Sequence, residues 1–258
     1  MSAFVLLHES SKKGRKIMKI GIIAAEQEEF EAIINILKEE DRKEIYELTF
    51  VKGKIKEKTC ILVKSGVGKV NAARATQILI DNFKPECIIN IGVAGGLNPM
   101  LKIGDIVIGE TLVQHDFDIT AFGHAKGYIP GVGDKIYADD HLIKKVEEAI
   151  ENQEERAYKY EKGVIASGDI FCTEIPMRDK IYAKFNAECV EMEGAAIAQV
   201  CYLNKIPCLV IRAISDVPNG KNNIDCDNFI ELASKNCAQI IQKMCWQKME
   251  VNVTYKYI

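Results

Sequence analysis

The chain has 258 residues, of which 48% are apolar and 28% are charged, and its formal net charge is −3. This size and composition predict one large α/β domain in preference to two small ones, and the lack of a basic stripe argues against nucleic acid as a partner. No run of about 18 consecutive apolar residues occurs, so we expect no membrane span and no membrane partner.

Apolar runs of strand length alternate along the chain with segments of helical period. In chain order we expect a strand over residues 19–25, a helix over 26–40, strands over 44–52 and 56–64 joined by a turn at 52–54, a helix over 70–83, strands over 87–93 and 105–110, a long loop over 114–136, a helix over 139–154, a strand over 163–167, helices over 176–185 and 191–203, a strand over 207–214 and a helix over 227–246. This alternation predicts an α/β fold in which a single domain has a central mixed β-sheet flanked by helices.

The two ends of the chain fall outside this pattern. We expect residues 1–17 to be a disordered leader, residues 18–246 to form the domain and residues 247–258 to be a C-terminal tail.

The nine cysteines contain no Cys-x-x-Cys pair and lie mostly in apolar runs. This usage is typical of reduced, buried thiols and predicts a cytoplasmic protein without a disulfide framework. None of the four histidines stands at a ligand spacing from a cysteine, so we expect no metal site and no cofactor.

Two glycine-rich segments are similar to phosphate-binding loops without matching them. In Ser65-Gly66-Val67-Gly68-Lys69 the Walker pattern fails, because positions 63 and 70 are both valine. Gly92-Val93-Ala94-Gly95-Gly96 lacks the Gly-x-Gly-x-x-Gly spacing of dinucleotide-binding loops. The second segment fits a tight turn at a strand end and equally fits an edge where a small ligand approaches the main chain.

Carboxylates stand beside apolar segments in the C-terminal half. Glu191 and Glu193 flank Met192 at the start of an apolar helix pattern, and Asp216 closes the apolar strand pattern that precedes it. Carboxylates are rarely buried unless they are paired or used in chemistry. Ligands of open α/β folds lie at the C-terminal ends of strands. Asp216 is therefore either the cap of a following helix, a role that Ser215 also suits, or part of a site.

Seven segments in order carry a family resemblance from about Met18 to Trp246. They are residues 18–25 with Glu28-Glu29, residues 64–70, Ala94-Gly95-Gly96-Leu97, residues 115–123, Ser167-Gly168-Asp169, Val190-Glu191-Met192-Glu193 and Arg212-Ala213-Ile214-Ser215-Asp216. Together they resemble the 5′-methylthioadenosine/S-adenosylhomocysteine nucleosidases of the purine nucleoside phosphorylase superfamily. The resemblance implies a nucleoside phosphorylase-like fold and an enzyme that uses water to break the bond between adenine N9 and ribose.

The resemblance gives the catalytic roles to two carboxylates. Asp216 would protonate N7 of adenine, which burial of its carboxyl favours, and Glu29 would take a proton from the attacking water. Glu193 would accept hydrogen bonds from the ribose 2′- and 3′-hydroxyls, and Met192 would pack against the sugar. By residue type alone, Glu29 is equally consistent with a solvated glutamate in the first turn of a helix, which the helix dipole stabilises. Met192 is likewise consistent with a side chain that fills the hydrophobic core.

Further contacts with the nucleoside follow from the same resemblance. Phe171, for which residue type alone favours a core position, would stack on adenine, and the backbone of Cys172 would read the edge of the base. Ser215 and Arg212 would orient Asp216. The resemblance also implies that Val67 contacts the 5′-substituent and that the glycine-rich edge contacts the nucleoside through Val93, Ala94 and Gly95. Glu191 would stabilise these contacts without touching the nucleoside itself.

The long loop supplies residues that family members lend to a neighbouring subunit. Phe122, His124 and Pro130 match that set, so the resemblance implies a homodimer with shared sites. Three positions depart from the family: Val93 replaces a common Ser, His124 a common Tyr and Cys226 a common Phe. Two of the three concern the 5′ side, so the preferred 5′-substituent stays open.

The loop after the first strand bears on the choice of nucleophile. Residues 24–29 carry three acids and no arginine, so a phosphate dianion would be repelled and water is favoured. Three alternatives remain open at this point: a phosphate-dependent purine nucleoside phosphorylase, an aminodeoxyfutalosine nucleosidase, and a nucleoside-binding protein without catalysis.

Overall fold

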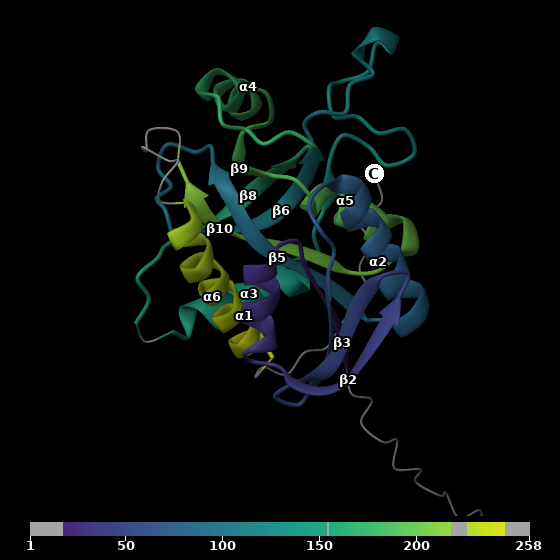
Figure 1. The fold of residues 1–258 in the computed structure, drawn as a ribbon. Helices are drawn as coiled ribbons and strands as arrows, with labels where there is room; N and C mark the ends of the chain where they lie inside the picture. The colour runs from purple at the N-terminus through teal and green to yellow at the C-terminus, as the bar shows by residue number, and fades with distance from the viewer. Residues whose placement is uncertain (1–17, 154, 218–225, 246–258) are drawn as a thin grey trace, which may run out of the picture.

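The protein is described here by a computed structural model, which covers residues 18–153, 155–217 and 226–245 (Figure 1). In chain order its elements are β1 (Lys19–Ala24), α1 (Gln27–Ile34), β2 (Lys38–Ile45), β3 (Leu48–Ile55), β4 (Lys58–Lys64), α2 (Lys69–Phe83), β5 (Cys87–Gly96), β6 (Ile106–Gln114), the short 3₁₀ helix η1 (Thr120–Phe122), β7 (Ile136–Tyr137), α3 (Asp140–Glu151), β8 (Tyr160–Ser167), α4 (Ile175–Phe185), β9 (Ala187–Glu191), α5 (Gly194–Asn204), β10 (Cys208–Asp216) and α6 (Cys226–Met244). The expected leader and tail lie outside the described residues.

The sheet is mixed and is joined through β5. This strand pairs in parallel with β1 and with β10, and its last residues, Gly95 and Gly96, pair antiparallel with β9. Because β10, β6, β8 and β9 follow one another in pairs, they close a ring with β5, while β1, β4, β3 and β2 extend the sheet outward. The carboxyl ends of β1, β5 and β10 therefore meet at one edge of the sheet.

Helices cover both faces of the sheet, which confirms the expected fold class. Figure 1 shows α1, α3 and α6 gathered on one side, α2 and α5 together on the other, and α4 at the end of the sheet beside β9. Neighbouring residues of the central strands point to opposite faces, so Ile88 belongs to one core cluster and Ile89 to the other. Burial on both faces explains why these strands read as continuous apolar runs.

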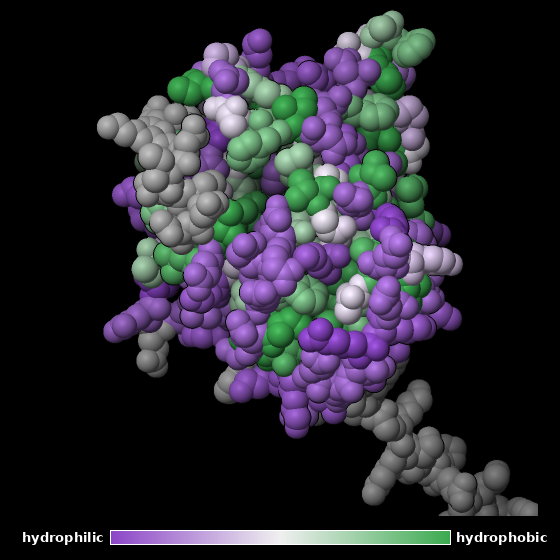
Figure 2. All heavy atoms as spheres, viewed as in Figure 1, coloured by the Kyte–Doolittle hydropathy of each residue, from purple (hydrophilic) through white to green (hydrophobic). Residues whose placement is uncertain are grey.

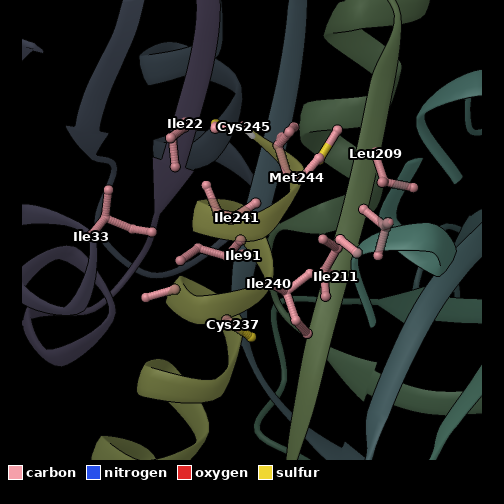
Figure 3. Close-up of a cluster of buried hydrophobic side chains, with 14 of the residues drawn as sticks. Ile22, Ile33, Ile91, Leu209, Ile211, Cys237, Ile240, Ile241, Met244 and Cys245 are labelled. Atoms are coloured by element: carbon pink, nitrogen blue, oxygen red, sulfur yellow. The ribbon is translucent and has the colours of Figure 1, made fainter. Parts of the chain in front are cut away.

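The cluster beneath α6 is the larger of the two main cores. Figure 3 shows Ile240 and Ile241 of α6 among Ile91 of β5 and Ile211 of β10, with Ile33 of α1 nearby, and all five are fully buried. Packing of α1 and α6 against these strands fixes the first turn of α1, where Glu29 lies.

The expected turn at residues 52–54 is wrong. Gly53 lies inside β3, paired with Glu39, and a Cβ at this position would overlap the Lys38 carbonyl. The turns are instead at Tyr46-Glu47, where both residues have positive φ, and at Lys56. The expected helix over 26–40 also ends early, at Ile34, because Lys38–Ile45 is a strand with almost every side chain exposed. A charged edge strand has no apolar alternation by which sequence could identify it.

The helix expected from residue 191 begins three residues later. Ala187–Glu191 forms β9, and α5 begins at Gly194. Glu191 therefore ends a strand and Glu193 precedes a helix. The expected strand over 44–52 is also wrong in its bounds, because it contains the end of β2, the turn at Tyr46-Glu47 and the start of β3. The other expected strands and helices are confirmed with shifts of a few residues at their ends, and residues 114–136 are confirmed as a long connection whose only helix is η1.

The described cysteines agree with the expectation of buried thiols. Eight are buried and free, and the side chain of the ninth, Cys226, lies outside the described part of the chain. Across the ranges that the structure describes, no helix combines the length and hydropathy that a membrane crossing requires.

Candidate active site

The carboxyl ends of β1, β5, β9 and β10 bring three buried carboxylates to one edge of the sheet. Glu29 lies in the first turn of α1 after β1, Glu193 stands between β9 and α5, and Asp216 ends β10. All three are less than a tenth exposed. The end of β5 is their common neighbour: the Val93 N–H donates to Glu29, and Gly95 lies against Asp216 and pairs with β9.

Glu29 is held by backbone donors on both of its oxygens. Oε2 accepts from the N–H groups of Ala25 (2.8 Å) and Glu26 (3.0 Å), and Oε1 accepts from the N–H of Val93 (3.0 Å). A Cβ on Gly92 would lie 2.7 Å from Oε1, so glycine is what allows the carboxylate to approach the strand. The first glycine of the 92–96 segment thus serves a close approach rather than a turn.

Arg212 lies at the centre of the buried charges, but it does not contact Asp216 as expected. Its guanidinium pairs with Glu191 and donates to the Asn90 side chain (2.6 Å), and it lies 4.0 Å from Glu193. The expectation that Arg212 orients Asp216 is corrected in this respect: Arg212 organises the glutamates instead.

Glu191 connects this arginine to the start of α5. It accepts from the Ser167 hydroxyl and from Arg212, and its Oε2 also accepts from the N–H groups of Glu193 (3.0 Å) and Gly194 (2.7 Å). Since Glu191 satisfies the first free N–H groups of the helix, it fixes the backbone that carries Glu193.

Glu193 faces the glycine loop before α2. Its Oε1 accepts from the Gly68 N–H (2.8 Å), and Gly68 has a φ of 97°, which only glycine adopts readily. Burial, followed by the negative charge of Glu191, raises the pKa of Glu193 to about 7, although Arg212 and the Gly68 bond oppose the shift. The side chain therefore changes charge near neutral pH.

Asp216 has two polar partners on different oxygens. The Ser215 hydroxyl lies 3.1 Å from Oδ1, as expected, whereas Oδ2 pairs with Arg178 of α4. Sequence reasoning missed Arg178. The signal available was a charged residue that shares the buried face of α4 with Ile181, three residues further along.

A second polar network connects the glycine loop to the long connection. Lys69 Nζ donates to Asp116 (2.6 Å) and to Gln114 (3.0 Å), and Asp116 also accepts from the Asp169 N–H (2.9 Å). Burial works against ionisation of Asp116, but the bonds from Lys69 and Asp169 outweigh it and lower the pKa of this carboxyl. Lys69 therefore holds the loop that precedes Phe171 beside the start of α2.

The other expected contact residues fall into two groups. Cys172 and Ala94 are buried, Met192, Val93 and Gly95 are half-buried, and Phe171 and Val67 are 68% and 40% exposed beside them. Phe122 is 82% exposed, and His124, also exposed, stacks on Tyr128 with ring centroids 4.4 Å apart. Pro130 is exposed as well. Figure 2 shows apolar residues at the tip of this projecting loop.

Among the described side chains, no three His, Cys, Asp or Glu residues are grouped as a metal site would need.

Comparisons with known proteins show the family of this chain. The sequence model of the phosphorylase superfamily matches residues 19–245. A 5′-methylthioadenosine/S-adenosylhomocysteine nucleosidase of Staphylococcus carnosus is 40% identical over 87% of this chain and 98% of its own. The crystal structure of such a nucleosidase from Colwellia psychrerythraea, in complex with adenine, has a TM-score of 0.85 and 36% identity over 90% of this chain and 96% of that one.

A solved structure of another specificity is similar as well. The futalosine hydrolase of Helicobacter pylori has a TM-score of 0.82 and 34% identity, and the match covers 88% of this chain and 97% of that one. By the extent of these matches, the chain belongs to the 5′-methylthioadenosine/S-adenosylhomocysteine nucleosidase family of the phosphorylase superfamily.

Proposed function

We propose that this chain hydrolyses the N-glycosidic bond of 5′-methylthioadenosine and S-adenosylhomocysteine and releases adenine. The observation that carries the proposal is the set of three buried carboxylates, Glu29, Glu193 and Asp216, around the end of one strand. The family match and the adenine complex of a similar nucleosidase support the same reaction.

Asp216 acts as the general acid in this proposal. Protonation of N7 lets the electrons of the bond between N9 and the anomeric carbon move into the purine, so that adenine leaves as a neutral molecule. The position of Asp216 at the end of β10, beside the loop of Phe171 and Cys172, supports its contact with the base.

Glu193 and Glu29 serve the sugar and the water. An ionised Glu193 accepts hydrogen bonds from the 2′- and 3′-hydroxyls and stabilises positive charge that develops on the ribose. Glu29 orients the attacking water and takes its proton. The backbone donors that fix Glu29 keep it in place without a hydroxyl at position 93, where this chain has Val.

Water is the nucleophile rather than phosphate. Both described arginines beside the carboxylates are already paired with acids, Arg212 with Glu191 and Arg178 with Asp216. A phosphate dianion would meet Glu29 and Glu193 without a free guanidinium to bind it. This distribution of charge disfavours the phosphorylase alternative.

The finer assignments belong to the same proposal. We propose that the enzyme acts in the cytoplasm, where it serves the salvage of methionine. We also propose that it is a homodimer in which Phe122, His124 and Pro130 complete the 5′ pocket of the partner subunit. The exposure of Phe122 and the free state of the eight described cysteines support this placement. Light scattering at two protein concentrations tests the dimer.

A futalosine derivative is the second candidate substrate. It is favoured by the similarity to the Helicobacter pylori futalosine hydrolase and by the changed residue His124 on the 5′ side. Both reactions use the same three carboxylates, so only the 5′-substituent separates them.

The test is release of free adenine from a panel of 5′-substituted adenosines and from aminodeoxyfutalosine, with and without phosphate. We expect the fastest turnover with methylthioadenosine or adenosylhomocysteine and the same rate in both buffers. Strict dependence on phosphate would reject hydrolysis, and a clear preference for the futalosine derivative would replace the proposed substrate. Binding of the nucleoside without turnover would identify the chain as a nucleoside-binding protein without catalysis.

A further inference from the structure

Arg178 connects two parts of the site that the sequence leaves unrelated. Its Nε donates to the carbonyl of Cys172 (2.7 Å), and its Nη2 pairs with Oδ2 of Asp216. The side chains of Arg178 and Asp216 are only 6% and 9% exposed. One buried guanidinium from α4 therefore fixes both the backbone expected to read adenine and the acid expected to protonate it.

The two oxygens of Asp216 are not equivalent. Oδ2 is bound to a permanent positive charge, so a proton on this oxygen is disfavoured. Oδ1 lies 3.1 Å from the Ser215 hydroxyl, which also lies 3.3 Å from the carbonyl of Ala94. A hydroxyl has one hydrogen and two lone pairs, so Ser215 can donate to Ala94 and accept from a protonated Oδ1. Oδ1 is thus the oxygen suited to carry the proton.

Gly95 of β5 leaves room for the pair of Arg178 and Asp216, because it has no side chain. A Cβ on Gly95 would lie 3.2 Å from Nη2 of Arg178 and 3.4 Å from both oxygens of Asp216. The ion pair therefore packs directly on the end of β5. Nη1 of Arg178 is buried and has no hydrogen-bond partner among the described residues, which leaves a donor for the base or for a water.

We propose that Arg178 is a positioning residue for general acid catalysis, which holds Oδ2 of Asp216 so that Oδ1 delivers the proton to N7. The inference rests on the proposed function. In the step, the O–H bond of Oδ1 breaks and the N7–H bond forms, while the electrons of the glycosidic bond pass to the purine. Asp216 is left as a carboxylate, and the adjacent guanidinium stabilises that charge as it develops.

The pH dependence follows from the groups that face Asp216. Among the described residues these are Arg178 of α4, the Ser215 hydroxyl of β10 and the thiol of Cys172, whose pKa is raised, chiefly by burial. Cys172 is therefore neutral at neutral pH, and Arg178 supplies the charge. Because the positive charge of Arg178 favours the carboxylate form of its partner, removal of that charge should move the alkaline limb of the kcat/KM profile to higher pH.

The experiment compares two leaving groups in the variants Arg178→Met and Arg178→Lys. The substrates are methylthioadenosine, whose base must be protonated, and the 4-nitrophenyl glycoside of 5-methylthioribose, whose phenolate leaves without a proton. Lys180→Met is the matched control, because it removes an exposed charge from the same helix. Thermal unfolding and circular dichroism verify that each variant is folded.

For Arg178→Met we expect kcat on methylthioadenosine to fall about 10- to 100-fold, while kcat on the nitrophenyl glycoside changes less than about 3-fold. The alkaline limb should move to higher pH. Arg178→Lys should return the limb toward its wild-type position, and Lys180→Met should match the wild type.

An equal loss on both substrates with an unmoved limb would show a structural role and overturn the inference, as would wild-type turnover in Arg178→Met. Either result, obtained beside active wild-type protein and inactive Asp216→Asn, leaves the proposed function intact. A wild-type chain that released no adenine would refute the proposed function and the inference with it. An active Asp216→Asn would remove Asp216 from the acid role and overturn the inference, while hydrolysis itself would stand.

Discussion

Arg212 pairs with Glu191, and Glu191 in turn accepts hydrogen bonds from the N–H groups of Glu193 and its neighbour. The arginine thus acts on Glu193, the carboxylate proposed to bind the ribose, through the backbone as well as through its charge. Four buried polar groups depend on this one guanidinium, since Asn90 also accepts from it and the Ser167 hydroxyl shares Glu191.

Arg212→Met should destabilise the fold strongly. The side chains of Arg212 and Glu191 are 1% and 2% exposed, so the change leaves a carboxylate buried without its counter-ion. Loss of one partner of a buried pair costs about 3–5 kcal/mol, which urea unfolding would measure. Arg42→Met is the matched control, because Arg42 pairs with Glu39 at the surface, and the urea midpoint should stay in place. A similar midpoint for both variants would contradict the central role of Arg212.

Asp216→Asn should abolish most turnover and retain binding. The amide keeps the size of the side chain but cannot supply a proton to N7, so kcat should fall by about 10²- to 10⁴-fold. Adenine release and equilibrium binding of a nucleoside analogue measure the two effects separately. Turnover within a few-fold of the wild type would remove Asp216 from the acid role.

Stability should depend on pH through Glu193. The pKa of this group is raised in the folded protein from 4.5 to about 7, so between these values the folded state holds a proton that the unfolded state has lost. The contribution is present at low pH and disappears as the pH rises through about 7.

Glu193→Gln removes that titration. Between pH 4.5 and 7 the unfolding free energy of the wild type should fall, relative to the variant, by up to about 3 kcal/mol. Urea unfolding of both proteins at several pH values makes the comparison. Parallel curves for the two proteins would mean that Glu193 is ionised throughout this range.

Gly92→Ala should act through Glu29. The added Cβ would lie 2.7 Å from Oε1 of Glu29, which displaces the carboxylate from the Val93 N–H. We expect kcat to fall at least about 10-fold with a smaller change in KM. The control combines Gly92→Ala with Glu29→Gln. This double variant should be no slower than Glu29→Gln alone, because both substitutions disable the same carboxylate, that of Glu29. Additive losses would place the effect of Gly92 elsewhere.

Much of the central sheet could be predicted because its strands are buried on both faces. β1, β5 and β10 read as apolar runs, and the carboxylates at their ends stood out against them. The family resemblance then indicated which carboxylates carry the chemistry. The structure brings these three carboxylates to the end of β5.

Register and partners could not be predicted in the same way. β2 is charged along its length, so no apolar pattern distinguished the true turn at Tyr46-Glu47 from the false one near Gly53. The partner of Arg212 depends on how β9 and β10 meet in space, and Arg178 reaches Asp216 from a helix that lies 38 residues away along the chain. Such contacts arise from tertiary packing and have no local signature.

The course of β5 fixes how far apart the reacting groups can be. Val93 anchors Glu29 and Gly95 adjoins Asp216, and two residues of extended chain span about 7 Å. An inserted residue between Val93 and Gly95 would move these two positions apart by about 3.3 Å and turn one of them to the opposite face of the strand, so β5 could no longer contact both Glu29 and Asp216 in the same way. The loop of Phe122, His124 and Pro130, which is proposed to meet the 5′-substituent, lies outside β5 and is free of that constraint. Changes in this loop could therefore alter the preferred nucleoside while the contacts of β5 with the two carboxylates stay constant.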